Sequence, residues 1–477
     1  MQNQLLRQLP VRVVSTVFLL ILSSPHTYAE EHETELRKEI NELKMIIKRQ
    51  REQLNSQSEL VQKLDARLKN VEFKDATDTS TISGDSLLDT SKAGSNKHRI
   101  RDSVGDLNAN AVKAGDFAGA IMLPNTREVQ LAIGGFVKTA VLWDSDADNL
   151  GVDFLPSLLN DQNEQDGSFA LDSTLTRLLI DVRAPTDGDG QLRGYLEWDL
   201  NDNNNGSPEL KTRLAYGSWT TPAGTITAGQ NWSTFMDLKL LPEGLTEPTV
   251  SGAIFVRQSQ IQWSAPLGDQ WTYHAAIEDP SSNDFDSDML DIVRKSRLPD
   301  VVLGIEYNNP QWHWRLNSIL RKLEFDIPGG SNDSATGWGL SASGRYNFSS
   351  GDWLGASASY GEGLGRYLLG IRSTAGGAVE SPTSALELRD NWGGFINYFH
   401  KWSETTRSTI TLGHAKADAL DFQPGTTFES TSYGSVNFLW SALPYLTLGA
   451  EYQYGTLEFV DGNDIDNNRI SFAVQIF

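Results

Sequence analysis

Residues 131–143 read Leu131-Ala132-Ile133-Gly134-Gly135-Phe136-Val137-Lys138-Thr139-Ala140-Val141-Leu142-Trp143. One alternating phase carries Ile133, Val137, Val141 and Trp143, and Lys138 stands on the opposite phase. Successive side chains of a β-strand point to opposite faces, so this period of two predicts a strand with one apolar face and one polar face. The same alternation recurs to the end of the chain in Leu178–Val182, Leu192–Leu200, Leu340–Phe348 and Leu446–Tyr454.

The connections between these segments alternate between short and long. Tight turns are expected at Pro185–Gly190, Thr221–Gly224, Pro266–Asp269, Asn308–Pro310, Ser349–Asp352, Trp402–Thr405 and Ala442–Pro444. Longer loops lie between them, among them Asp144–Ser168, Asn201–Pro208, Asp279–Leu298 and Gly370–Ala385. A soluble antiparallel sheet shows the same alternation of side chains but has no reason to sort its connections. Residues 128–477 are therefore predicted to form an all-β, antiparallel transmembrane barrel of about sixteen strands. The register of the last strand stays open, because its apolar phase is one step out from Phe477.

Composition excludes several classes of protein. Only 39% of residues are hydrophobic, which argues against a bundle of transmembrane helices. The formal net charge of -22 argues against nucleic acid as a partner. The chain has no cysteine, so disulfide frameworks and thiolate metal sites are excluded, and no cofactor is expected.

Residues 1–29 have the features of a secretory signal peptide. Arg7 and Arg12 precede an apolar stretch from Val13 to Leu22, and small residues lead to a cleavage site after Ala29. The apolar stretch is too short to cross a bilayer. The protein is therefore expected to leave the cytoplasm.

Residues 30–74 show a heptad repeat. One seam position is occupied by Ile40, Ile47, Leu54, Val61 and Leu68, which is typical of a coiled coil and favours an oligomer over a lone surface helix. Residues 75–127 are rich in Ser, Asp, Thr, Gly and Ala. That composition predicts a flexible polar tether between the coiled coil and the barrel.

Basic residues of the barrel segment tend to lie on the phase opposite the apolar one. An arginine facing lipid at mid-depth would cost about 2–4 kcal/mol, so these side chains are expected to face the lumen. Guanidinium groups there would offer a path to carboxylates and phosphates. The candidate pore-lining residues are Lys138, Arg177, Arg193, Arg213, Arg257, Arg315 and Arg345. Arg257 is the least certain by phase, because Phe255 and Ile261 share it.

Two features could weaken an anion path. Each base could be neutralised by an acid on the wall, and Asp181, Glu197, Asp199 and Glu451 are available. About half of the bases are expected to be paired in this way. Acids also gather in the loops, as at Asp146 and Asp148, where they would oppose anions at the mouth.

The connection Trp232–Gly252 is the longest in the first half of the barrel. A sixteen-stranded tube is wide enough to leave an aqueous channel, so some element has to narrow it. This connection could fold inside as a constriction, or it could remain an ordinary external loop.

The chain resembles the DcaP-like trimeric porins of Gram-negative outer membranes. The resemblance rests on the order of signal, heptad helix, tether and arginine-rich barrel, and on Gly135–Lys138, Ala228–Asp237 and Gly252–Ile261. It implies a homotrimer in a bilayer that contains lipopolysaccharide, with the coiled coil in the periplasm. It also implies passive uptake of small anionic solutes such as dicarboxylates.

Three other functions stay open. A sugar porin would need a line of aromatic side chains in the lumen, and Tyr195 is the clearest candidate. A structural barrel tethered by its coiled coil would have a plugged lumen. An enzyme is not expected, because no nucleophile motif is present, although a His–Ser pair on neighbouring strands remains possible.

Overall fold

The computed structural model describes residues 113–124, 126, 128–146, 150–160, 167–200, 209–280, 285–286, 293–326, 332–371, 377–380 and 385–477. The predicted signal peptide, the coiled coil and the first part of the tether lie outside these residues. Within the described part of the chain, no helix has the length and apolar character needed to cross a membrane.

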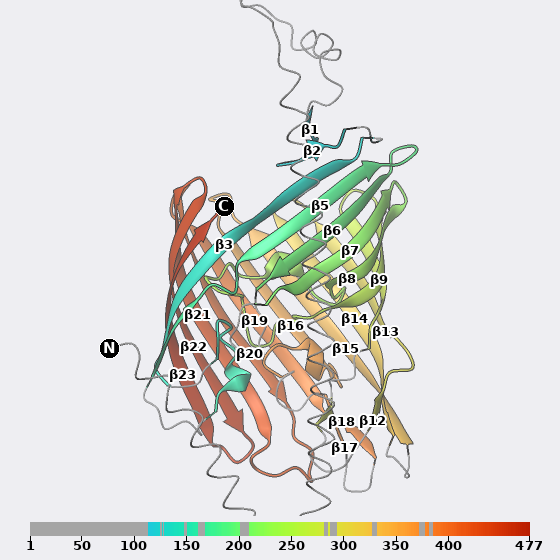
Figure 1. Ribbon diagram of the computed structural model, residues 1–477. Coiled ribbons are helices and arrows are strands. Elements are labelled where there is room, and N and C mark those ends of the chain that lie inside the picture. The colour runs from blue at the N-terminus through green and yellow to red at the C-terminus, as the bar shows by residue number, and fades with distance from the viewer. Residues whose placement is uncertain are drawn as a thin grey trace, which may run out of the picture. The chain divides into compact units, whose positions relative to one another are not determined.

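The described chain forms a closed antiparallel β-barrel of sixteen wall strands (Figure 1). Two wall strands are interrupted. β4 and β5 both pair with β3 and count as one wall strand, and β12 and β13 both pair with β14 and count as another. Pairing of β23 with β3 closes the barrel. The first eight wall strands are β3 (Gln130–Asp144), β4 (Ser168–Asp172) with β5 (Arg177–Pro185), β6 (Gln191–Asp199), β7 (Lys211–Thr221), β8 (Gly224–Trp232), β9 (Arg257–Leu267), β10 (Trp271–Glu278), and β12 (Val293–Lys295) with β13 (Asp300–Asn308). The other eight are β14 (Trp312–Asp326), β15 (Asn332–Asn347), β16 (Trp353–Glu362), β19 (Asp390–Lys401), β20 (Thr406–Ala417), β21 (Phe428–Leu443), β22 (Leu446–Phe459) and β23 (Asp464–Ile476).

The predicted alternation is confirmed in the wall. Ile133 and Val137 of β3 are exposed on the outer surface, and Lys138 is half-buried on the inner one. In β23, Ile470 and Phe472 face outward as well, and Ile470 stands opposite Trp143 in the seam with β3. The register of the last strand is therefore set by its apolar phase, and the terminal Phe477 follows the strand.

The connections sort as predicted. The seven short turns all lie at one end of the barrel, which is called the turn end here, and the other connections lie at the loop end (Figure 1). One prediction needs correction, because the last part of the expected tether is ordered. β1 (Lys113–Ala114) pairs with β2 (Ile121–Met122), and β2 pairs with the start of β3 at the turn end. Phe117, between β1 and β2, lies 3.9 Å below the guanidinium of Arg183 and so clamps this hairpin to the wall.

Three loops fold into the barrel from the loop end. They are residues 150–159 with the 3-10 helix η2 (Pro156–Leu158), residues 233–256 with η3 (Leu238–Leu240), and residues 363–371 with η4 (Gly365–Tyr367). Their apolar side chains form a buried cluster with inward-facing wall residues, because an apolar loop residue inside a wide barrel gains by leaving water. A smaller sheet joins two loops at the loop end, with strands β11 (Phe285–Asp286), β17 (Ala378–Glu380) and β18 (Leu386–Leu388).

Candidate functional site

Residues 233–256, called the constriction loop here, lie inside the barrel, which decides between the two predictions for this connection. Wall side chains hold its backbone at several points. The Asn397 amide donates to the Leu240 carbonyl at 2.6 Å, and the Asn437 amide donates to that of Glu243 at 2.6 Å. The Leu245 N–H donates to the Glu451 carboxylate at 2.9 Å. Glu451, which the sequence offered as a partner for an arginine, therefore binds the loop.

A cavity of about 320 Å³ separates the constriction loop from the wall strands β3 to β8. The wall contributes basic and aromatic side chains, and the loop contributes Leu241, Pro242, Gly244 and Thr246–Pro248. The basic residues in its lining are Lys138, Arg177 and Arg213. Three of the seven predicted residues thus meet at one cavity, which we call the basic cavity.

Arg213 is the most heavily paired base at the basic cavity. Its guanidinium donates to Glu197 at 2.8 Å, to Asp199 at 2.6 Å and to Glu247 of the constriction loop at 2.7 Å. Arg177 shares two of these acids, at 3.5 Å from Glu197 and 3.3 Å from Glu247. Arg213 is 3% exposed, so three carboxylates are needed to compensate its buried charge and fill its donors.

Glu247 belongs to the loop and stays ionised in this cluster. Burial opposes ionisation of its carboxyl group, but the charge of Arg213 and the hydrogen bond from it outweigh burial and lower the pKa of Glu247. The acid therefore cancels part of the positive charge that the wall presents to the cavity.

Lys138 and Arg257 lie on the same wall as Arg177 and Arg213 but differ from them in their pairing. Among the described residues, no carboxylate forms an ion pair with either side chain. The Arg257 guanidinium lies 5.0 Å from the Trp232 ring, and Trp232 itself lines the basic cavity. Arg257 stands directly opposite Trp232 in the pairing of β8 with β9, so its inward placement follows from that of Trp232 despite the phase of Ile261.

Arg193 lies nearer the turn end. It and Arg183 both donate to Asp181, with Nη2 atoms at 2.9 Å and 2.8 Å from the same carboxylate oxygen. The Arg193 guanidinium also lies 4.6 Å from the Tyr195 ring, which packs against Tyr216 at 5.4 Å. Two cations share one acid here, so this level of the lumen keeps a net positive charge.

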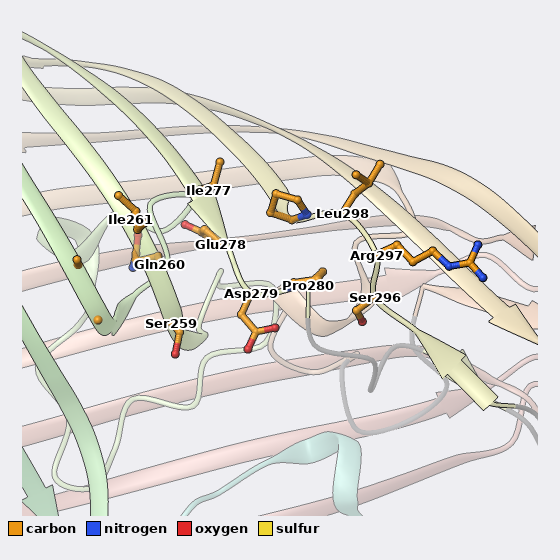
Figure 2. Close-up of a pocket in the computed structure, with 13 residues that line it drawn as sticks. Ser259, Gln260, Ile261, Ile277, Glu278, Asp279, Pro280, Ser296, Arg297 and Leu298 are labelled. Carbon is orange, nitrogen blue, oxygen red and sulfur yellow. The ribbon is translucent and has the colours of Figure 1, made fainter.

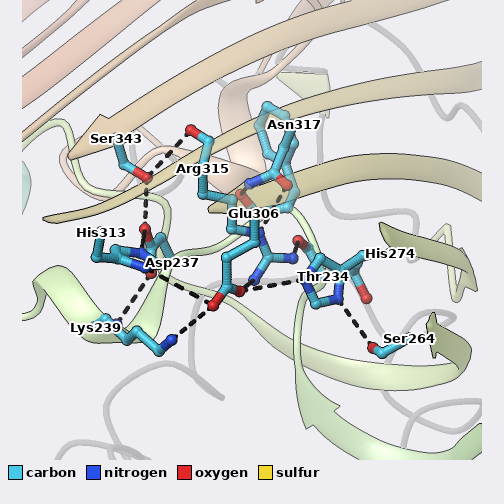
Figure 3. Close-up of polar contacts among 11 residues, drawn as sticks. Thr234, Asp237, Lys239, Ser264, His274, Glu306, His313, Arg315, Asn317 and Ser343 are labelled. Carbon is cyan, nitrogen blue, oxygen red and sulfur yellow. Dashed lines mark hydrogen bonds and ion pairs between the residues drawn. The ribbon is translucent and has the colours of Figure 1, made fainter. Parts of the chain in front are cut away.

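Arg315 and Arg345 lie on the other side of the constriction loop and hold its backbone. Figure 3 shows Arg315 beside Thr234 of the loop. Arg315 donates to the Thr234 carbonyl at 2.7 Å, and Arg345 donates to the Lys239 carbonyl at 3.3 Å. The nearest described carboxylate to Arg315 is Glu306 at 3.9 Å. The seven predicted residues thus divide into five on the wall from β3 to β9 and two that fasten the loop.

A His–Ser pair of the kind left open by the sequence is present in the same network (Figure 3). The Ser264 hydroxyl lies 2.9 Å from Nδ1 of His274, and His274 Nε2 lies 3.2 Å from Glu306. Lys239 of the constriction loop binds the second oxygen of Glu306 at 2.6 Å. This series of contacts runs from Ser264 to Lys239 of the constriction loop, so the Ser264–His274 pair helps to hold that loop in place.

Sequence reasoning missed the acids and loops that complete the site. No wall partner was predicted for Asp237, Glu243 or Glu247 of the constriction loop, and each of them binds a wall residue. The inward course of residues 150–159 and 363–371 was missed too. The sequence feature that could have predicted this inward course is a group of apolar residues within a loop. These are Phe154 and Leu155 in the first loop and Tyr367–Leu369 in the second.

A second hollow lies on the outer surface and takes no part in the lumen. It has a volume of about 430 Å³ and is lined by β8, β9, β10 and residues 296–299 (Figure 2). Its apolar side chains Ile261, Ile277 and Leu298 are exposed, as expected of a wall that faces lipid.

A closed barrel of sixteen strands, apolar outside and narrowed by an inward loop, is the architecture of a porin, a channel of the outer membrane. The sequence profile of the DcaP outer membrane protein family matches residues 149–473. This match spans more than half of the chain, and the protein therefore belongs to the DcaP outer membrane protein family. Family and fold together place it in the Gram-negative outer membrane.

Solved structures show the same fold. The outer membrane channel DcaP of Acinetobacter baumannii superposes with a TM-score of 0.65 at 20% identity, covering 73% of this chain and 97% of that one. An anion-selective porin from Comamonas acidovorans gives a TM-score of 0.51 at 9% identity, covering 73% and 99%. No curated protein sequence matches this chain.

Proposed function

We propose that this protein is a passive diffusion channel for small anionic solutes, which cross the lumen along the wall from β3 to β9. The observation that carries the proposal is the charge of the basic cavity. Lys138 and Arg257 lack paired carboxylates among the described residues, and Arg177 and Arg213 add two further cations. A dicarboxylate suits such a site, because two separate cations can each bind one carboxylate.

Pairing weakens this field without removing it. Arg177 and Arg213 face Glu197, Asp199 and Glu247, so these five groups alone carry a net negative charge. Lys138 and Arg257 change the net charge of this cluster from -1 to +1. Arg193 with Arg183 and Asp181 adds a second positively charged level nearer the turn end. Selectivity is therefore expected to depend on the bases without ion pairs.

Reversal potentials in planar bilayers under a salt gradient test the proposal. Wild-type protein is expected to prefer anions, and Arg257→Ala or Lys138→Ala should lower the preference by about three- to tenfold, which corresponds to about 0.7–1.4 kcal/mol of potential at the site. Arg297→Ala, on the outer wall, serves as the matched control and should leave selectivity unchanged. A cation-selective wild-type channel would mean that the acids dominate and would end the proposal.

The assembly proposed with this function is a homotrimer in a bilayer that contains lipopolysaccharide, with the predicted coiled coil in the periplasm. Family membership supports it, and so does the length of the strands. β5 to β10 have 8–11 residues, whereas β14, β15 and β21 have 15 or 16. A low wall of this kind suits a contact with another protomer. Migration in gels without boiling, compared with boiled samples, would report the number of subunits.

A further inference from the structure

Two loop segments cross the interior of the barrel side by side. They are residues 250–256 of the constriction loop and residues 366–371, and together they are called the crossbar here. Ile254 faces Leu368 in an antiparallel bridge. The Leu369 N–H donates to the Ala253 carbonyl at 2.9 Å, and the Phe255 N–H donates to that of Tyr367 at 3.1 Å. The crossbar is thus a short two-stranded ribbon made from two separate loops.

One end of the crossbar is fixed to the wall by a buried polar network. The Tyr367 hydroxyl donates to Asp300 at 2.8 Å and lies 3.3 Å from Glu278. Arg366 donates to the Asp279 carbonyl at 2.8 Å. Tyr367 and Asp300 are fully buried, so the loss of either partner would leave polar groups without compensation.

The other end rests on the opposite wall at points where glycines remove side chains. A Cβ at Gly252 would overlap backbone atoms of Gly394 and His414, and Gly252 has a φ of 85° that favours glycine. Gly370, with a φ of 94°, lies instead against side-chain atoms of Thr431 in β21 and of Ser251 in the crossbar. At Gly252 backbone therefore lies directly on backbone, and the crossbar spans the lumen from β9 and β10 to β19–β21.

The crossbar is apolar both where it meets the wall and where it meets the lining of the basic cavity. Its apolar side chains, with Leu155 and Leu159, pack into one buried cluster with residues of the wall. The wall members of that cluster are Ala276, Val302, Ile319, Ala415, Ala417, Phe428 and Leu457. Phe255, a member of the same cluster, packs against Trp232 at 4.7 Å, and Trp232 lines the basic cavity.

We infer that the crossbar is a second constriction element, which closes the half of the lumen near β10 to β22 and confines solutes to the basic wall. The segment 366–371 is then a determinant of selectivity without touching the solute. This inference takes the identity of the solute, a small anion, from the proposed function. The route through the lumen is inferred from the crossbar alone. If the crossbar opened, solutes would bypass the basic wall and pass Asp300, whose charge is balanced by Arg321 at 3.0 Å and Arg366 at 3.7 Å.

Loss of the Tyr367 anchor tests the route. Tyr367→Ala is expected to raise single-channel conductance by about twofold or more and to reduce the preference for anions. Val302→Ala is the matched control, because it thins the same apolar cluster on the wall and leaves both crossbar segments in place. Unchanged conductance in a Tyr367→Ala protein that still shows the heat-dependent gel shift of a folded barrel would overturn the inference.

A reversible lock provides a second test that does not depend on a destabilised variant. Ile254 and Leu368 form a pair without mutual hydrogen bonds, the type with the closest Cα atoms, and the chain has no other cysteine. Ile254→Cys with Leu368→Cys should oxidise to a disulfide with wild-type conductance. In the Tyr367→Ala background, oxidation should restore low conductance and a reducing agent should release it. A reducing agent without effect there would count against the crossbar as a barrier.

The outcomes separate the two proposals. A channel that is cation-selective but gains conductance on loss of Tyr367 would refute the anion path and retain the crossbar. An anion-selective channel with no response in either crossbar test would retain the anion path and refute the crossbar.

Discussion

Asp237 of the constriction loop is in direct contact with His313 of the wall strand β14, with Oδ2 2.7 Å from Nε2 (Figure 3). Their side chains are 7% and 3% exposed. Ser343 of β15 donates to the same carboxylate oxygen at 2.6 Å. One loop acid therefore contacts two wall strands, and these contacts hold the first half of the loop against the wall.

Asp237→Asn should loosen this half of the loop. The amide has one oxygen to accept two donors and carries no charge, so the loss is expected to be about 1–3 kcal/mol of stability. Current noise in single channels should rise, and the temperature at which the barrel loses its folded gel mobility should fall. Asp269→Asn in an exposed turn is the control and should change neither quantity.

The same contact sets a pH range for the loop. Burial opposes ionisation of Asp237, but the hydrogen bond and charge of His313 outweigh it and hold the pKa below its ordinary value of 3.8. Because the pKa of Asp237 is lower in the folded protein than in the unfolded chain, its ionised form stabilises the fold. This stabilisation is complete at pH values above the pKa of the unfolded state, and it is lost as the pH falls through the pKa of the folded state. Current noise of the wild type should therefore stay constant from pH 8 to about pH 4 and rise only below it. A rise in current noise between pH 5 and pH 6 would mean that titration of a histidine, and not of Asp237, releases the constriction loop.

Glu247→Gln should increase the preference for anions. The lowered pKa of Glu247 means that the wild type carries a full negative charge there at neutral pH. Its removal adds one net positive charge beside Arg177 and Arg213, and the permeability ratio should rise about threefold, more at low salt. Glu404→Gln is a matched control, because Glu404 is 90% exposed in a turn. A fall in the ratio would show that Arg213 needs Glu247 to keep its place.

The wall of the barrel could be predicted from the sequence because its signals are local. Alternation in Leu131–Trp143 reports which face meets lipid, and turn residues report where strands reverse. The inward loop was left open, because Trp232–Gly252 offers both charged and apolar residues. Its course depends on partners such as His313 and Glu451, which lie far along the chain and come close only through the closed barrel.

The site was predicted less well than the wall for the same reason. Phase alone identified Lys138, Arg177 and Arg213 as inward residues, and all three line the basic cavity. Phase says nothing of position around the barrel, so Arg315 was grouped with them although it binds the loop backbone. Glu197 and Asp199 were expected to be available to some base of the wall, without a particular partner. Both bind Arg213, because β6 and β7 are neighbouring strands.

Gly252→Ala should displace the constriction loop from the wall. The new methyl group would overlap backbone atoms of Gly394 and His414, and the positive φ adds strain. Stability should fall by more than about 1 kcal/mol, with higher conductance, as measured by thermal unfolding and bilayer recording. Gly194→Ala in β6 is the control, because no neighbouring atom would lie within 4 Å of the added methyl group. Equal effects of the two substitutions would remove close backbone contact as the explanation.

The seam that closes the barrel contains an ion pair whose loss should be costly. Arg469 of β23 stands opposite Asp144 of β3 and binds it with two hydrogen bonds, at 2.8 Å and 2.9 Å. Arg469 is 1% exposed and also donates to the Val152 carbonyl of the first inward loop. Arg469→Met leaves the carboxylate of Asp144 buried without its partner, and the expected loss is about 3–5 kcal/mol.

The double variant Arg469→Met with Asp144→Leu isolates the reason for that loss. If the penalty comes from the uncompensated carboxylate, removal of both charges should recover most of the stability, because the apolar pair needs no compensation. Unfolding by heat in detergent, followed by gel mobility, would measure all four members of the cycle. If the double variant is as unstable as Arg469→Met, the contact of Arg469 with Val152 stabilises the seam, and the first inward loop rather than the ion pair holds the barrel closed.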